Sequence, residues 1–268
     1  MSLSRDLEAL GLRRGDMVLM HSSFRALGPV AGGIGKLISE LMHVLGPKGT
    51  LVIPTLSYAW VTEDNPVFDV RKTRSCIGAV PEFFRQLPGV CRSLSPTHSA
   101  AALGRLAREV TQGQLQDQTP VGPHSPFRRV AQAGGKLLFL GCGLGPNTSI
   151  HGAEELAEVP YLFLPGLFPF TVVDEEGRCH DIFCSRHSFR SGDIVYAQRY
   201  ERLQGLLDPK DRRIGRVAQA DCWLLDARAL WQGAETALRQ DAFSLVEPLS
   251  ARDGGQPAQE SETGGSAG

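Results

Sequence analysis

Residues 136–158 read KLLFLGCGLGPNTSIHGAEELAE and predict a strand, a turn and a helix in that order. The apolar run 137–140 is short and sharply bounded, which is typical of a buried strand. Three glycines and a proline then predict a tight turn, and Asn147, Thr148 or Ser149 can cap the following helix. A strand end beside a helix N-terminus is the usual place for a site in an α/β sheet.

The helix predicted over residues 150–158 carries one histidine and three glutamates. His151, Glu154, Glu155 and Glu158 are spaced three, four and seven residues apart, so they can share one helical face. A histidine with a carboxylate in reach is a complete general-base unit. The alternative explanation of the same four residues is a solvated helix face.

The length, composition and net charge indicate a globular protein without a polyanionic partner. The chain has 268 residues, of which 42% are hydrophobic and 21% charged, and its net charge is −1. This balance argues against a binder of nucleic acid or of an anionic membrane. We find no signal-peptide core and no apolar run of membrane-spanning length. Six cysteines without a disulfide-framework spacing predict a cytoplasmic protein with reduced thiols.

A βαβ unit is predicted near the N-terminus. Buried strands over 17–20 and 50–53 flank a helix over 34–45, which a Gly/Pro turn ends. The loop HSSFRALGPVAGGIGK lies between the first strand and the helix, where backbone N–H groups gather phosphates. Its hydroxyls, paired glycines and basic residues suit a pyrophosphate or an adenosine 3′-phosphate. A purely structural turn is the alternative.

The remaining patterns complete an α/β fold. Helices are predicted over 4–12, 77–86 and 127–132, and antiparallel strands over 162–173 and 179–183 around a turn at 174–177. A charged helix over 194–207, strands over 214–217 and 220–225 and a helix over 227–238 follow. We predict one domain over residues 1–250, with a parallel core and antiparallel strands added late. Residues 251–268 predict a disordered tail.

Two further polar residues are candidates for the site. Thr55 ends the second strand, where its hydroxyl could donate a hydrogen bond to a developing oxyanion. More often such a threonine is merely a strand residue. His98, in the sequence PTHS, could contact a ligand or could be held by backbone groups.

Metal and thiol chemistry are disfavoured. Cys179, His180, Cys184 and His187 match no usual zinc spacing, so we predict no metal. Cys142 lies in a glycine-rich turn without a histidine neighbour in the sequence, which favours a buried small residue over a nucleophile.

Five ordered blocks give the chain a family resemblance. Over roughly residues 7–238 it resembles the aminoglycoside 3-N-acetyltransferase family, also called the antibiotic N-acetyltransferase family. The resemblance implies an α/β sandwich unrelated to the common small N-acetyltransferase (GNAT) fold, and transfer of an acetyl group from acetyl-CoA to an amine. The blocks are GDMVLMHSSFRALGPVAGG, LGPKGTLVIPTLSY, FDVRKTRSCIGAVPEFFRQLPGVCRSLSPTHS, SPF and NTSIHGAEELAEVPY.

The resemblance also implies roles for individual residues. His151 would be the base that deprotonates the amine, Glu154 would orient its imidazole, and Thr55 would lie near the thioester carbonyl. Glu155, Glu158 and Tyr58 are candidates for contact with the amine substrate, and family habit suggests a homodimer through the added strands. The elements that resemble the CoA-binding parts of the family supply His21, Ser22, Ser23, Arg25, Gly32, Gly33, Thr97, His98 and Ser99.

Some features leave alternatives open. The family usually carries a histidine where this chain has Ser95, and the stretches 119–127 and 161–170 are not typical of drug-resistance members. A metabolic or natural-product amine is therefore as good a candidate for the acceptor as an aminoglycoside. Two other functions are a covalent acyltransferase or hydrolase, with Cys142 or Ser149 as the nucleophile, and an inactive CoA-binding or ligand-binding relic.

Overall fold

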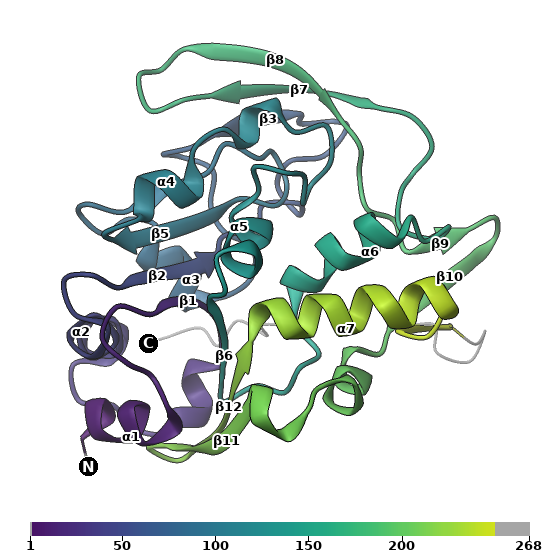
Figure 1. The fold of residues 1–268 in the computed structure, drawn as a ribbon. Coiled ribbons are helices and arrows are strands. Elements are labelled where there is room, and N and C mark those ends of the chain that lie inside the picture. The colour runs from purple at the N-terminus through teal and green to yellow at the C-terminus, as the bar shows by residue number, and fades with distance from the viewer. Residues whose placement is uncertain (1, 250–268) are drawn as a thin grey trace, which may run out of the picture.

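A seven-stranded mixed sheet forms the centre of the protein (Figure 1). The computed structural model describes residues 2–249, so the tail predicted over 251–268 lies outside the described residues. The strand order is β11-β12-β6-β1-β2-β5-β4. Strands β6, β1 and β2 are parallel, and every other neighbouring pair in this sheet is antiparallel. The strands are β1 (Met17–Ser22), β2 (Thr50–Pro54), β4 (Cys91–Arg92), β5 (Ala100–Gly104), β6 (Lys136–Leu140), β11 (Arg212–Val217) and β12 (Ala220–Asp226).

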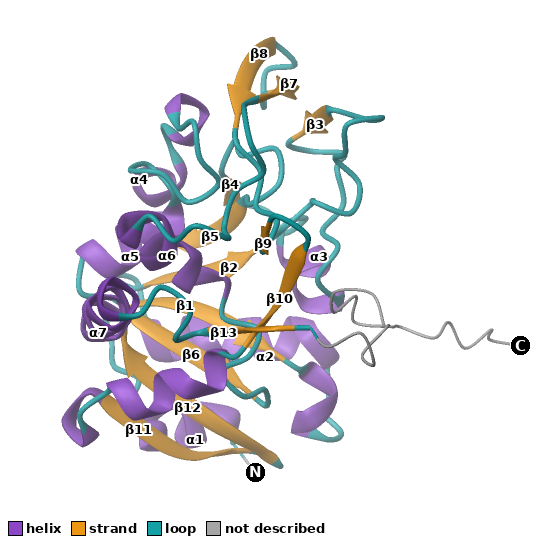
Figure 2. Ribbon diagram, turned by 90° about the vertical axis from the view of Figure 1, so that its right-hand side faces the viewer, coloured by secondary structure: helices purple, strands orange, loops and turns teal. Residues whose placement is uncertain are grey.

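Helices cover both faces of this sheet because its central strands are apolar on both sides (Figure 2). Along β1, Val18 and Met20 face one layer, whereas Leu19 faces the other. Helices α1, α2 and α3 pack on the first face, and α5, α6 and α7 pack on the second. The helices are α1 (Leu3–Leu10), α2 (Gly33–Leu45), α3 (Ala79–Phe84), α4 (Ala107–Thr111), α5 (Pro126–Gln132), α6 (His151–Ala157) and α7 (Ala227–Gln240).

Two small sheets flank this sandwich. In one, β7 (Phe168–Val173) and β8 (Cys179–Cys184) form the predicted antiparallel pair, and β3 (Val67–Asp69) joins it in parallel. The other has the order β13-β10-β9, from Val246–Pro248, Ile194–Gln198 and Arg190–Ser191. The predicted α/β class with added antiparallel strands is confirmed, although β4 and β5 show that some of these strands come early. Within residues 2–249, no helix has the length and apolarity needed to span a bilayer.

The prediction of a helix over residues 194–207 is wrong. The chain there forms β10 and then a 3-10 helix, Tyr200–Leu206. Strand β10 pairs with β9 on one side and with β13 on the other. The β9 pairing is local, but the β13 pairing comes from distant sequence, and together they override the local helical pattern. The single domain and the homodimer stay predictions.

The sheet topology gathers several loops at one edge. The parallel strands β1, β2 and β6 end together there, and β1 lies between the other two, so the strand order reverses at its carboxyl end. Such a switch point is where α/β sheets bind ligands. Strand β5 runs the opposite way and begins at the same edge, with Ala100 opposite Pro54. The loops after the three parallel strands and the loop before β5 therefore converge.

Candidate active site

The helix that bears His151 begins with a tight 3-10 turn. Residues Thr148–Ile150 form this turn, and α6 follows directly from His151. The side chains of Asn147, Thr148 and Ser149 do not cap α6, so that prediction is wrong. Instead, Ser149 Oγ donates to Asn147 Oδ1 at 2.7 Å. This bond fixes the turn and places His151 at the first position of the helix.

His151 is held by a buried carboxylate. Its Nδ1 lies 2.8 Å from Glu154 Oε2, and a carboxylate can only accept here, so Nδ1 is the donor. Glu154 is 0% exposed and also accepts from Tyr161 Oη and Tyr200 Oη, each at 2.9 Å. Tyr200 Oη lies 3.0 Å from His151 Nδ1 as well. With Nδ1 so engaged, Nε2 is the nitrogen that can accept a proton from outside.

Both tyrosines remain hydrogen-bond donors. Burial raises the pKa of Tyr200 well above its usual value, and the charge of Glu154 raises it further. The same two causes, in the same order, raise the pKa of Tyr161. Sequence reasoning missed both residues. They lie seven and 46 positions from Glu154, and the folded chain brings them together.

Two more histidines surround His151. Its ring centroid lies 5.9 Å from that of His98 and 5.0 Å from that of His187, and His98 and His187 are 4.8 Å apart. His98 precedes β5, in a turn where Ser95 Oγ accepts its backbone N–H at 3.1 Å. Burial lowers the pKa of both His98 and His187 well below the usual value, and neighbouring histidine charge lowers it further. Both imidazoles are therefore neutral at physiological pH.

The glutamates that follow Glu154 have different roles. Glu155 is buried, and its carboxyl group accepts from His187 Nε2 at 3.1 Å and from the Val121 backbone N–H at 2.8 Å. Burial raises its pKa. Glu158 is exposed and lies beyond the end of α6 in a left-handed conformation, with φ of 55°. The prediction that it shares a face with His151 is wrong, because α6 ends at Ala157.

Thr55 belongs to a buried polar cluster at the end of β2. Its Oγ1 lies 3.1 Å from Ser99 Oγ and accepts from Arg92 Nε at 3.2 Å. Ser99 Oγ and Arg92 Nη2 both donate to the Thr55 carbonyl at 2.8 Å. Thr97 joins the same edge, because its carbonyl accepts from the Ser57 backbone N–H at 2.9 Å. Tyr58 is 42% exposed, with its ring centroid 6.3 Å from that of His98.

The predicted phosphate loop is divided between this edge and the surface. His21 is buried against Phe139, with ring centroids 5.0 Å apart, and burial followed by the charge of His151 lowers its pKa to about 3. The Ser23 backbone N–H donates to the Leu140 carbonyl at 2.9 Å, which ties the ends of β1 and β6 together. Ser22 is half-buried. Arg25 and Gly32 are exposed and Gly33 is half-buried.

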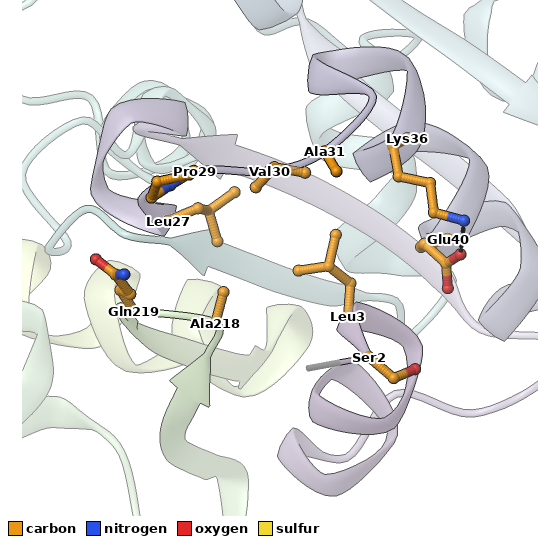
Figure 3. Close-up of a pocket in the computed structure, with 10 residues that line it drawn as sticks. All are labelled: Ser2, Leu3, Leu27, Pro29, Val30, Ala31, Lys36, Glu40, Ala218 and Gln219. Atoms are coloured by element: carbon orange, nitrogen blue, oxygen red, sulfur yellow. Dashed lines mark ion pairs between the residues drawn. The ribbon is translucent and has the colours of Figure 1, made fainter.

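A pocket of about 450 Å³ lies beside that loop (Figure 3). It is bounded by the loop, by the first residues of the chain, by α2 and by the turn between β11 and β12. Lys36 and Glu40 form an ion pair of 2.6 Å on its wall. None of the predicted CoA-binding residues lines it, and neither does any of the three clustered histidines. Its lining residues are Ser2, Leu3, Leu27, Pro29, Val30, Ala31, Lys36, Glu40, Ala218 and Gln219.

Ser149 and Cys142 are the two residues weighed for covalent catalysis. Ser149 is 0% exposed, and its hydroxyl donates to Asn147 rather than to an imidazole. Cys142 is half-buried and packs against the core. Cys179 is exposed and Cys184 is buried, as the alternation along β8 requires, and burial raises the pKa of Cys184 to about 12.

Comparison with known proteins assigns the family. Residues 19–239 match the model described as aminoglycoside 3-N-acetyltransferase. The chain is 40% identical over 244 residues to aminoglycoside N(3)-acetyltransferase IV of Salmonella sp, with 89% of this chain and 87% of that protein covered. It is 37% identical over 251 residues to aminoglycoside N(3)-acetyltransferase VII of Streptomyces paromomycinus, with 84% of this chain and 86% of that protein covered.

Solved structures share the fold. A variant of AAC(3)-IVa in complex with a gentamicin superposes with a TM-score of 0.75 at 31% identity, over 90% of this chain and 88% of that one. AAC-IIIb in a binary complex with CoASH superposes with a TM-score of 0.75 at 28% identity, over 89% of this chain and 95% of that one. From its sequence, its sheet topology and these relatives, the chain belongs to the aminoglycoside 3-N-acetyltransferase family of acetyl-CoA-dependent acyltransferases, which does not have the GNAT fold.

Proposed function

We propose that this protein acetylates an amino group of an aminoglycoside, with acetyl-CoA as the donor and His151 as the general base. The observation that carries the proposal is the bond between His151 Nδ1 and the fully buried Glu154 carboxylate at a topological switch point of the sheet. Relatives named for acetylation of the N3 position, and a family member bound to a gentamicin, support the acceptor. A family member bound to CoASH supports the donor.

The reaction needs one proton acceptor and one charge stabiliser. The acceptor amine gives a proton to His151 Nε2 as its nitrogen attacks the thioester carbonyl. The resulting tetrahedral intermediate breaks its C–S bond, and the imidazolium returns the proton to the departing CoA sulfur. Glu154 stabilises the imidazolium, while Tyr161 and Tyr200 keep its carboxylate in place. Thr55 stays the predicted oxyanion donor, although here its hydroxyl contacts Ser99 and Arg92.

The positions of the remaining predicted site residues suggest which of them contact the acceptor and which contact CoA. We propose that Tyr58 and Glu158, which are exposed, contact the acceptor, and that the buried Glu155 acts through His187 instead. His21, Thr97 and Ser99 lie at the switch-point edge, where the thioester end of CoA would approach. Ser22, Ser23, Arg25, Gly32 and Gly33 would contact the more distant parts of CoA.

His151→Ala tests the mechanism. Release of CoA from acetyl-CoA, followed with a thiol reagent, should fall by about 10²–10⁴-fold, because general-base assistance is worth that much. Binding of CoA, measured by calorimetry, should change little. The matched control is His43→Ala, at an exposed position on α2, which should keep full turnover. Near-normal rates in the His151→Ala variant would refute the assigned base.

An acceptor panel tests the substrate. Gentamicin and other aminoglycosides are compared with simple metabolic amines, and the acetylated nitrogen is located by NMR. We expect turnover with aminoglycosides at N3. Turnover confined to other amines would keep the chemistry and reject the acceptor. A trapped acyl-protein mass would instead favour a covalent route through Cys142 or Ser149.

A further inference from the structure

We propose that His98, His151 and His187 together form a binding site for a divalent transition metal, with Zn²⁺ as the fitting ion, and that metal bound there inhibits the enzyme. The binding is argued from geometry alone. The inhibition rests on the proposed function, because the metal would occupy the base.

The three rings converge from three separate parts of the chain. His98 lies before β5, His151 begins α6, and His187 follows β8. One nitrogen of each ring lies within 4.8 Å of one nitrogen of each of the others. A tetrahedral site with metal–nitrogen bonds of about 2.0–2.1 Å places its nitrogens about 3.4 Å apart. Closing the largest such gap asks each ring to move by roughly 0.7 Å, which side-chain torsions allow.

The nitrogens that point away from a metal already have partners. His151 Nδ1 bonds Glu154 Oε2 at 2.8 Å, and His187 Nε2 bonds Glu155 Oε1 at 3.1 Å. His98 Nδ1 lies 2.9 Å from Thr97 Oγ1, which can act as acceptor for the ring N–H. Metal-binding histidines characteristically donate their second N–H to a carboxylate or another oxygen, which fixes the tautomer and the ring orientation. Two of these three rings have a carboxyl partner.

One nitrogen of the cluster lacks a partner. His187 Nδ1 is buried, the side chain is 4% exposed, and no hydrogen-bond partner for this atom lies among the described residues. A buried polar atom without a partner costs about 1–3 kcal/mol, so it calls for a water, an ion or another ligand. His187 Nε2 is taken by Glu155, so only Nδ1 remains for the shared space. A metal ion would satisfy it.

The three histidine nitrogens determine which metal ions can bind. Three imidazole nitrogens are ligands that suit zinc, and cobalt, nickel and copper accept the same ligands. Magnesium and calcium prefer oxygen ligands, and the nearby carboxyl groups of Glu154 and Glu155 are already occupied by hydrogen bonds. Zinc on His151 Nε2 would remove the lone pair that the amine needs. We therefore expect inhibition that competes with the amine and that a chelator reverses.

Calorimetry on the tag-free protein, stripped with EDTA and dialysed, tests the binding without reference to activity. Zn²⁺ should bind at one site with micromolar or tighter affinity, Co²⁺ should bind with the strong visible absorption of a tetrahedral complex, and Mg²⁺ should not bind. His187→Ala should weaken Zn²⁺ binding at least tenfold. Glu155→Gln should weaken it by about 10–100-fold, as loss of an outer carboxylate does, while keeping the ligand rings in place. The matched control His180→Ala changes a histidine on β8 outside the cluster and should leave the affinity unchanged.

Activity is measured on the same samples. CoA release should fall in proportion to zinc occupancy, and EDTA should restore it. Millimolar or absent binding, or binding that survives both His187→Ala and Glu155→Gln, overturns the site. Tight binding at the cluster with unchanged turnover would confirm the site but overturn the inhibition, and would contradict the role of His151 as base. Failure of the metal site and failure of the proposed base are thus distinguishable.

Discussion

At the scale of single residues, Tyr200 contacts both His151 and the carboxylate that holds it. Its hydroxyl donates to Glu154 Oε2 at 2.9 Å and lies 3.0 Å from His151 Nδ1. It is fully buried, at 1% exposure, so water does not replace a lost bond easily. A hydrogen bond to a buried charged group is worth about 1.5–3 kcal/mol. Tyr200 is therefore a positioning residue for the base.

Tyr200→Phe removes this hydroxyl and little else. We expect kcat to fall about tenfold, the free energy of unfolding to fall by about 1.5–3 kcal/mol, and KM for acetyl-CoA to stay unchanged, because Tyr161 still holds Glu154. Steady-state kinetics and urea unfolding measure these effects. Tyr196→Phe is the matched control, because it removes the hydroxyl of another buried tyrosine, one that is not among the described partners of Glu154. Equal effects in the two variants would argue against a positioning role for Tyr200.

The contacts of Glu154 also show what local spacing can predict about a site. A separation of three residues in a helix predicted the contact between His151 and Glu154, because helix geometry alone brings such residues together. Tyr200 and His187 reach the same site from segments whose positions depend on the whole fold. No local pattern points to them. His187 was weighed only within a zinc spacing along β8, whereas its neighbours are the histidines of two other elements.

At the scale of elements, α6 and α7 pack so closely that one glycine is required between them. A Cβ built on Gly152 would lie 2.0 Å from Trp231 Cη2, far inside contact distance. Trp231 is 6% exposed and belongs to α7. Gly152 is next to His151 in the sequence. The packing of these two helices therefore sets the position of the base.

Gly152→Ala should push the helices apart. Overpacking of this kind costs about 1–3 kcal/mol, and a shift of His151 by about 1 Å can cost 10²-fold in rate. Urea unfolding and turnover test both expectations. Gly35→Ala in α2 is the control, because its added Cβ would meet only Phe83 Cζ at an ordinary 3.5 Å. That change should leave stability equal or raise it by about 0.5–1 kcal/mol. A Gly152→Ala protein with unchanged stability and rate would contradict the packing argument.

Secondary structure was predictable where burial follows local periodicity. Strands β1, β2 and β6 are continuous apolar runs, and α2 and α7 have apolar residues at helical spacing, so sequence alone indicates them. The segment 194–207 differs because its secondary structure depends on the strands that pair with it. Strand β10 is fixed by pairing with β9, which is too short to show a pattern, and with β13, which is distant in the sequence. Strand β5 likewise becomes an antiparallel addition only through pairing with β2, and β4 only through pairing with β5.

At the scale of the whole molecule, buried neutral histidines make stability depend on pH. His21, His98 and His187 all have lowered pKa values, chiefly because burial disfavours their charged forms. In the unfolded chain they take up protons below about pH 6.5. The unfolded state then binds more protons than the folded state. The stability is thus complete above pH 6.5 and is lost as the pH falls, until the folded pKa is reached, which is about 3 for His21.

The substitution His21→Phe removes one of these three titrating groups. Phenylalanine keeps a ring against Phe139 and does not titrate, so the variant should lose less stability than the wild type as the pH falls. One proton is worth up to about 1.4 kcal/mol per pH unit, so between pH 6.5 and 5.0 the loss in unfolding free energy should shrink by up to about 2 kcal/mol. Urea unfolding across that range measures it. His43→Gln changes an exposed histidine and should leave the pH dependence unaltered. If His21→Phe follows the wild-type curve instead, then His21 takes up its proton in the folded protein as readily as in the unfolded chain, and the acid sensitivity has another source.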